Sequence, residues 1–190
     1  MSSTWRMIGW GVVLVSIAFA PGRARSNQRP RGPAQRLLGP ISSLAASAQW
    51  VRVDHAFRAG RPALAFARAE RALALDPASP EGWSFLAWQQ ASFLASEVRE
   101  SDPARRLAWI RASLATAARG EAQSRDPAEL ALLQAVILVK VATLDPDIGW
   151  PGGLRALWEE AATHFERAHR LGHPAGKDGM EAAIQAALAE

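Results

Sequence analysis

The sequence predicts an all-α fold, and three observations support that prediction. Helix-forming residues dominate the 190-residue chain, and no segment shows the sustained β-branched alternation that is typical of strands. Aspartate–proline pairs at Asp76, Asp102, Asp126 and Asp145 mark points where one helix ends or the next begins. Small residues also recur at helical spacing, which allows neighbouring helices to approach closely. We therefore expect an antiparallel stack of helical hairpins over residues 41–190.

The stretch between Gly60 and Ala87 carries the most specific pattern in the chain. Gly60 provides a turn, and the small residues Ala65 and Ala72 and the closing proline Pro77 follow it. A tryptophan-led motif then begins the next helix, with Trp83, Leu86 and Ala87. A further fragment repeats the small–aromatic–small spacing at Ala161, Phe165 and Ala168. This pattern resembles the tetratricopeptide repeat, whose units are pairs of antiparallel helices. An alanine-rich helical bundle that produces such spacings by chance is the alternative.

The sequence departs from the repeat pattern at several positions. Ala69 stands at the usual aromatic position and Gln90 at the usual tyrosine, while Pro174 falls one residue late. The resemblance implies about three hairpins followed by a C-terminal capping helix, because a terminal repeat needs a closed outer face. The implied activity is binding to other molecules rather than catalysis.

Charge divides the chain into a basic N-terminal part and a nearly neutral remainder. Six of the 22 basic residues lie within residues 1–36, which contain no acidic residue, so 16 basic and 18 acidic residues remain for the rest. The predicted helical domain therefore offers no strongly basic face, and we expect no nucleic-acid partner. The chain contains no cysteine, which excludes disulfides and thiolate metal sites.

Residues 1–22 are predicted to be a signal peptide or a membrane anchor. The apolar run 7–20 would rise about 21 Å as a helix, short of a hydrocarbon core of about 30 Å, and Ala18-Phe19-Ala20 offers a cleavage pattern before Pro21. Three alternatives stay open for this segment: membrane contact through residues 5–22, cleavage and export to the periplasm, and a buried soluble helix. The side of the membrane also stays open. Residues 23–40 are basic and rich in proline and glycine, which indicates a linker.

Capping and spacing predict seven helices in the rest of the chain. In the first of them Leu44, Ala48, Val51 and His55 fall near helical spacing, and we expect them on its packed face. The helix that begins at Glu81 is expected to continue to about Arg99. The predicted ranges are 41–58, 61–75, 81–99, one from Asp102-Pro103, one from Asp126-Pro127 to about 143, 154–171 and 177–189.

Two other packing expectations concern the later helices. After Asp102, apolar residues Leu107, Ile110 and Leu114 form a stripe, while alanines at 108, 112 and 115 offer a close-approach surface. In the last helix, Met180, Ala183, Ile184, Ala187 and Leu188 fall on one side. The segment from Leu130 is apolar nearly all round, which indicates burial between neighbours.

The resemblance also implies a binding face. In tetratricopeptide-repeat proteins ligands usually lie on the concave face formed by the first helix of each pair. Matching positions to the motif assigns to that face Trp50, Asp54, Arg58, Ser84, Trp88 and Ser92. Tryptophan and arginine are common binding hot spots. Packing of Trp50 and Trp88 inside the domain is the alternative.

The C-terminal histidines are the only candidates for chemistry. His164, His169 and His173 stand near Glu160 and Glu166. His164 and His169 would project roughly 140° apart on a helix, since each residue turns about 100°. We therefore predict no metal, no cofactor and no catalytic residue at this cluster.

The sequence as a whole favours a non-enzymatic protein-interaction or scaffold module held at or near a membrane, with a protein or peptide partner. A structural subunit of a membrane complex, docked through its N-terminal segment, is the second hypothesis. An enzyme with a site among the C-terminal histidine and glutamate residues is the third.

Overall fold

A computed structural model describes residues 41–190, and within that range all regular secondary structure is helical, with no strand. The prediction of an all-α fold is therefore confirmed for this part of the molecule. Predictions about residues 1–22 and 23–40 lie outside the described residues. The elements are α3 (Ile41–Arg58), α4 (Pro62–Leu75), α5 (Pro80–Gln89), a short π-helical turn η1 (Gln90–Leu94), α6 (Pro103–Gln123), α7 (Pro127–Leu144), α8 (Gly153–Arg170) and α9 (Gly176–Leu188).

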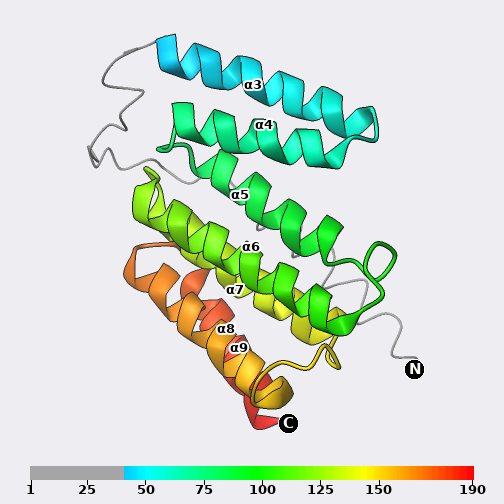
Figure 1. The fold of residues 1–190 in the computed structure, drawn as a ribbon. Helices are drawn as coiled ribbons and strands as arrows, with labels where there is room; N and C mark the ends of the chain where they lie inside the picture. Colours follow the sequence, from blue (N-terminus) through cyan, green and yellow to red (C-terminus); the bar gives the residue numbers. More distant parts are fainter. Residues whose placement is uncertain (1–40) are drawn as a thin grey trace, which may run out of the picture.

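Each helix packs against the helix that precedes it in the chain, and α5 also contacts α7. Figure 1 shows the consequence, a layered arrangement with α3 at one end and α8 and α9 at the other. The core runs through all layers. Its largest fully buried side chains include Leu86 on α5, Ile110 on α6 and Leu157 on α8.

The turn between α3 and α4 uses a left-handed glycine. Gly60 has a φ of 68°, a conformation that L side chains rarely adopt, and Pro62 then opens α4. The buried face of α4 consists of alanines, and Ala65, Ala69 and Ala72 are each fully buried. Small side chains at this face allow the two helices to lie close together.

Trp83 anchors the start of α5. It is 6% exposed, and its indole Nε1 donates a hydrogen bond to the carbonyl of Pro77 at 2.9 Å, which ties the helix to the loop before it. Leu86 and Ala87 are also buried, so all three residues of the tryptophan-led motif face the core. Ser79 caps the helix by accepting from the backbone N–H of Gly82.

The helix that begins near Glu81 is shorter than predicted. Regular α-helix ends at Gln89, a π-helical turn follows to Leu94, and turns occupy the residues up to Arg99. The Ala95 N–H bonds to the Gln90 carbonyl, and the Arg99 guanidinium lies 3.8 Å over the Phe93 ring. The prediction of a helix to about Arg99 was therefore wrong beyond Leu94, and helix propensity gave no sign of the break.

The start signals of α6 and α7 act as predicted. The Asp102 carboxylate accepts from the Ala104 N–H, and the Asp126 carboxylate accepts from the Glu129 N–H. Helix α7 is buried on nearly all sides, as its apolar sequence indicated. Among the described residues it is also the one helix long and apolar enough to cross a membrane, but most of that span is buried inside the molecule, as in the core helix of a soluble protein.

The expected packed face of α3 was wrong. Leu44 and Val51 are 70% and 71% exposed, and Ala48 and His55 are also exposed. The residues that pack inward are on the opposite side and are mostly small, namely Ser42, Ala46, Val53 and Ala56. The predicted face was assigned by helical spacing, whereas close contact with the alanine face of α4 selected the small residues on the opposite side.

The prediction that alanines at 108, 112 and 115 allow close approach to α6 was also wrong, since none of the three is buried. That contact lies at Gly120, where an added Cβ would be 2.5 Å from Cγ of Trp83. In the apolar stripe of α6, Ile110 is buried while Leu107 and Leu114 are partly exposed.

The C-terminal helices pack through small residues. Ala161, Phe165 and Ala168 of α8 are buried, and Phe165 lies close to Gly179 of α9. In α9, Ala183 and Ala187 face inward as predicted. Ile184 and Leu188 do not, because they are 42% and 69% exposed.

Candidate binding groove

A groove lies between α3 and α5, and its walls are largely aromatic. Its volume is about 200 Å³, and it is lined by Trp50, Val53, Asp54 and Phe57 from α3 and by Phe85 and Gln89 from α5. Ligand pockets for drug-sized molecules span about 300–1,000 Å³. A groove of the present size therefore suits a single side chain of a larger partner.

The aromatic walls are held by edge-to-face contacts. Trp50 meets Phe85 with ring centroids 5.5 Å apart, and Phe57 meets Phe85, Phe66 and Phe93 at 5.8, 5.6 and 6.0 Å. Such pairs contribute about 0.5–1.5 kcal/mol each beyond the burial of their area. Because the rings come from α3, α4, α5 and η1, they join the first layers of the molecule and fix the shape of the groove.

Polar groups stand among the aromatic walls. Asp54 forms an ion pair with Arg58 at 2.8 Å, one helical turn away, and both side chains are more than half exposed. Exposed pairs of this kind contribute about 0–1 kcal/mol, so the pair can exchange for contacts with a ligand at little cost. The Gln89 amide provides a donor and an acceptor.

The predicted binding residues divide into two groups. Trp50 and Asp54 line the groove, and Arg58 pairs with Asp54 beside it. Ser84, Trp88 and Ser92 do not line it. They lie on another face of α5 and η1, where the hydroxyl oxygens of both serines are buried without a hydrogen-bond partner among the described residues and Trp88 packs against the core.

Sequence reasoning missed the α5 wall of the groove. Phe85 and Gln89 follow the predicted residues by one position, and each one-residue step on a helix turns about 100°. Val53 and Phe57 on α3 were missed as well. The available signal was a phenylalanine in each of the two helices, at 57 in α3 and at 85 in α5.

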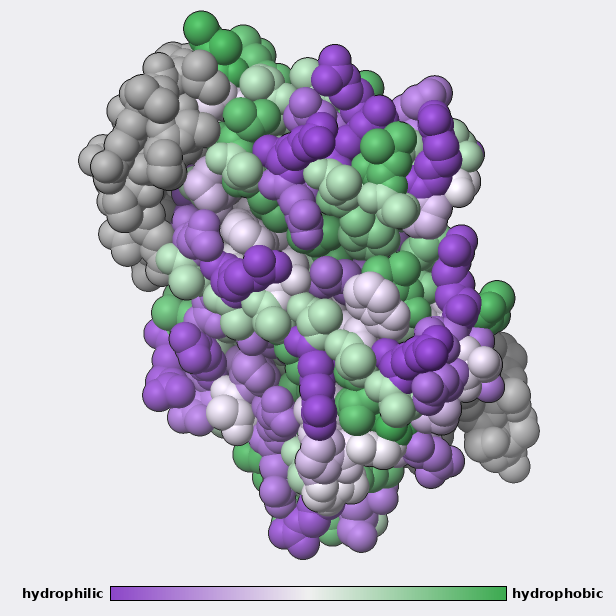
Figure 2. Space-filling model, in the orientation of Figure 1, coloured by the Kyte–Doolittle hydropathy of each residue, from purple (hydrophilic) through white to green (hydrophobic). Residues whose placement is uncertain are grey.

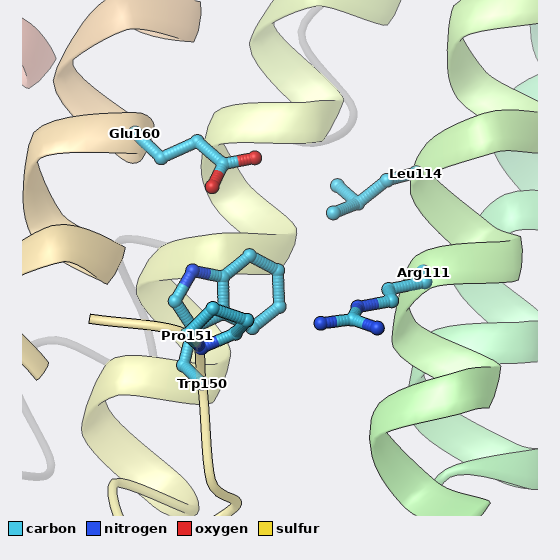
Figure 3. A pocket seen from close by; sticks show the side chains of 5 residues that line it. All are labelled: Arg111, Leu114, Trp150, Pro151 and Glu160. Atoms are coloured by element: carbon cyan, nitrogen blue, oxygen red, sulfur yellow. The ribbon is translucent and has the colours of Figure 1, made fainter. Parts of the chain in front are cut away.

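A second, more open pocket lies between α6, α8 and the loop that joins α7 to α8. Its volume is about 330 Å³, and Figure 3 shows Arg111 and Leu114 of α6 facing Trp150 and Pro151 of the α7–α8 loop, with Glu160 of α8 above them. Trp150 is 9% exposed and so anchors the loop on the core. None of these residues belongs to the predicted binding face.

The C-terminal histidines are dispersed rather than gathered. His173 stands 3.4 Å from Glu129 and accepts the N–H of Ala175 through Nδ1, while Glu166 pairs with Arg170. Within residues 41–190, no group of three or more metal-ligating side chains comes together. The predicted helical separation of His164 and His169 is one reason, since both are on α8.

His164 stands beside a polar network around Glu121 of α6 and senses its charges. The Glu121 carboxylate accepts from Arg167 at 2.6 Å and from the Gln134 amide at 3.0 Å. Burial lowers the pKa of His164, an effect that the Glu121 charge opposes and the Arg167 charge reinforces. The network joins α6, α7 and α8.

A buried arginine and a half-buried lysine also join elements of the fold. Arg106 of α6 makes a bidentate bond to Asp145 at 2.9 and 3.1 Å, and this hydrogen bonding raises the pKa of the arginine. Lys140 of α7 donates to the carbonyl of Ala91 at 3.0 Å, and burial lowers its pKa despite the charge of Asp145. Both cations have structural partners, and neither stands in the groove or the second pocket.

Comparisons with models of protein families, with curated proteins and with solved structures returned no match.

Proposed function

We propose that the described part of the chain is a tetratricopeptide-like stack of about three hairpins closed by α9. Support comes from the burial of the motif residues Ala65, Ala72, Trp83, Leu86 and Ala87. It also comes from Figure 1, where successive helices run in opposite directions. Pro77 receives the Trp83 hydrogen bond, so the proline and the tryptophan of the motif contact each other.

On this basis the protein is a non-enzymatic interaction module that holds a peptide or protein partner, tethered at or near a membrane by residues 5–22. One observation carries the binding part of the proposal. Aromatic side chains of α3 and α5 leave a groove between the first helices of the first two proposed pairs, the position at which this type of stack binds its ligands.

The groove also suggests what the partner presents. Its walls favour one apolar side chain of an extended segment, because Phe57 and Phe85 would surround it. Asp54 favours a neighbouring basic group, and Gln89 can bond to the peptide backbone of the partner. We therefore expect the preferred segment to combine an apolar residue with a lysine or arginine nearby.

The test is selection of peptides from a random-sequence display library on the full chain, followed by affinity measurements on variants of the polar lining. Asp54→Ala and Gln89→Ala remove polar contacts without touching the aromatic wall, and Asp178→Ala on α9 is the matched control. We expect the first two variants to weaken the selected peptides by about five- to thirtyfold, equivalent to roughly 1–2 kcal/mol each. The control should bind as the unmodified protein does.

Equal affinity for all four proteins would place the contact outside the groove and contradict the proposal. Selection of peptides with no shared apolar or basic residue would contradict the proposed partner chemistry.

A further inference from the structure

The outward face of α3 is apolar although it lies at an end of the stack. Ile41, Leu44 and Val51 are 64%, 70% and 71% exposed, and Ala48 between them is exposed too. These four residues, which we call the α3 stripe, follow one another by three, four and three positions, so they share one face of the helix. Figure 2 shows hydrophobic side chains at the upper edge of the molecule, over the N-terminal part of α3.

An apolar stripe is unexpected at this position. The end of a helical stack normally presents a polar outer face, because no further repeat covers it. The opposite end follows that rule more closely. There α9 exposes Lys177, Asp178 and Glu181 beside its two apolar residues Ile184 and Leu188.

Basic side chains border the α3 stripe. At about 100° per residue, Arg52 and Arg58 fall on its two sides and His55 continues its line toward the end of the helix. All three residues are exposed. An arginine beside an apolar stripe suits a membrane interface, because its aliphatic stem can cover apolar surface while its guanidinium stays among the head groups.

The sequence before α3 is basic and follows an apolar run. Residues 21–40 contain five arginines and no acidic residue, and they separate α3 from the apolar run 7–20. Anionic head groups attract basic segments next to a membrane by about 1 kcal/mol per charge.

We propose that the α3 stripe rests on an anionic lipid surface, so that the first helix of the stack lies flat in the membrane interface. This inference depends on the membrane tether in the proposed function. Trp50 and Asp54 lie roughly a quarter to a third of a turn away from the stripe around α3. The groove therefore remains open beside the membrane when α3 is docked.

A second copy of the chain is a poorer occupant of the stripe. Stable interfaces between proteins bury roughly 800 Å² per partner and involve about 20–30 residues on each side. The stripe offers four residues on a single helix, one of them alanine. Docking on a lipid surface requires no such minimum buried area, because the tether supplies part of the attachment.

The absence of cysteine permits a direct test in the full chain. Ala48→Cys places one label in the stripe, and Ala182→Cys places a matched label on an exposed position of α9. Each variant carries an environment-sensitive fluorophore and is mixed with vesicles of phosphatidylcholine and phosphatidylglycerol. Flotation of the vesicles reports attachment, while emission colour and quenching by aqueous iodide report whether the label has entered lipid.

We expect vesicles to shift the emission of the label at 48 to shorter wavelength and to protect it from iodide, with no change at 182. Replacing Leu44 and Val51 with asparagine should abolish that protection, because the stripe loses two of its apolar side chains. Both side chains are exposed, so we expect the substitutions to leave the fold intact. The same substitution of Val98, which is 98% exposed, should have no effect.

The unfavourable outcomes are distinguishable. Protein that floats while the label at 48 remains open to iodide overturns this inference and leaves the tether standing. Protein that does not float overturns the tether and the inference together. Protection of the label at 48 from iodide in the absence of vesicles also overturns the inference. If that protection depends on protein concentration, a second copy of the chain covers the stripe. If it does not, residues 1–40 cover the stripe.

Discussion

At the scale of single residues, buried polar groups connect helices that are distant in the chain. Glu121 accepts hydrogen bonds from Gln134 on α7 and Arg167 on α8, and its own side chain is 8% exposed. A carboxylate buried to this degree needs such partners, since an unpaired buried charge costs several kcal/mol. His164 stands beside this network with its Nδ1 buried and without a partner among residues 41–190.

His164 should make stability fall at mildly acidic pH. Its folded pKa lies below the ordinary value of 6.5, mainly because of burial, so the unfolded chain binds more protons near and below that pH. The free energy of unfolding therefore decreases as the pH falls through about 6.5. We expect His164→Gln to flatten this decrease, as measured by urea unfolding at pH 7.5 and 5.5. His55→Gln, at an exposed position, is the control and should keep the full pH dependence; identical slopes for all three proteins would contradict the assignment.

Some of these residues could be identified from the sequence and others could not. The burial of Trp83 and Leu86 followed from a motif whose spacing defines one face of a helix. The partners of Glu121 lie 13 and 46 residues away, and nothing in the local pattern links them. Likewise the serine hydroxyls at 84 and 92 were assigned to a binding face, whereas both are buried.

At the scale of elements, close approach of helices depends on a few small residues. An added Cβ at Gly120 would lie 2.5 Å from Cγ and 2.6 Å from Cβ of Trp83, and 3.0 Å from a methyl group of Leu130. The indole is held by its bond to Pro77, so it cannot move aside freely. Gly120 therefore sets the distance between α5 and α6.

Gly120→Ala should destabilise the protein although alanine favours helix. The gain in helix propensity is about 1 kcal/mol, and we expect the overpacking against Trp83 to exceed it and leave a net loss of about 1–2 kcal/mol. Chemical unfolding measures the difference. Ala118→Ser, at an exposed position of the same helix, should change stability by less than about 0.5 kcal/mol. A Gly120→Ala protein that is equally or more stable would show that α5 and α6 are not in close contact at this point.

Helix starts were more predictable than helix faces. Asp102 and Asp126 cap their helices as their sequence context indicated, because capping involves only neighbouring residues. The buried face of α3 depends on what α4 presents, and an alanine face opposite it selects small residues. The early end of α5 at Gln89 was not predicted either, since a single π-helical turn is rare and has no signature in the local sequence.

At the scale of the whole molecule, the order of the helices gives α3, the first helix of the described residues, two distinct surfaces. One side of α3 forms the groove with α5, and another carries the exposed α3 stripe. The helical class and the first wall of the groove, Trp50 and Asp54, followed from the sequence. The second wall did not, because the rotation of α5 against α3 is set by ring contacts between Trp50, Phe57 and Phe85.

The central claim is that the groove between α3 and α5 is the surface that holds a partner. Amide hydrogen exchange of the full chain, with and without a selected peptide, tests it most directly. We expect the peptide to slow exchange in residues 50–57 and 85–94, with no change in residues 111–114 and 150–160 around the second pocket. Slower exchange confined to the second pocket or to α9, with the groove unaffected, would contradict the account.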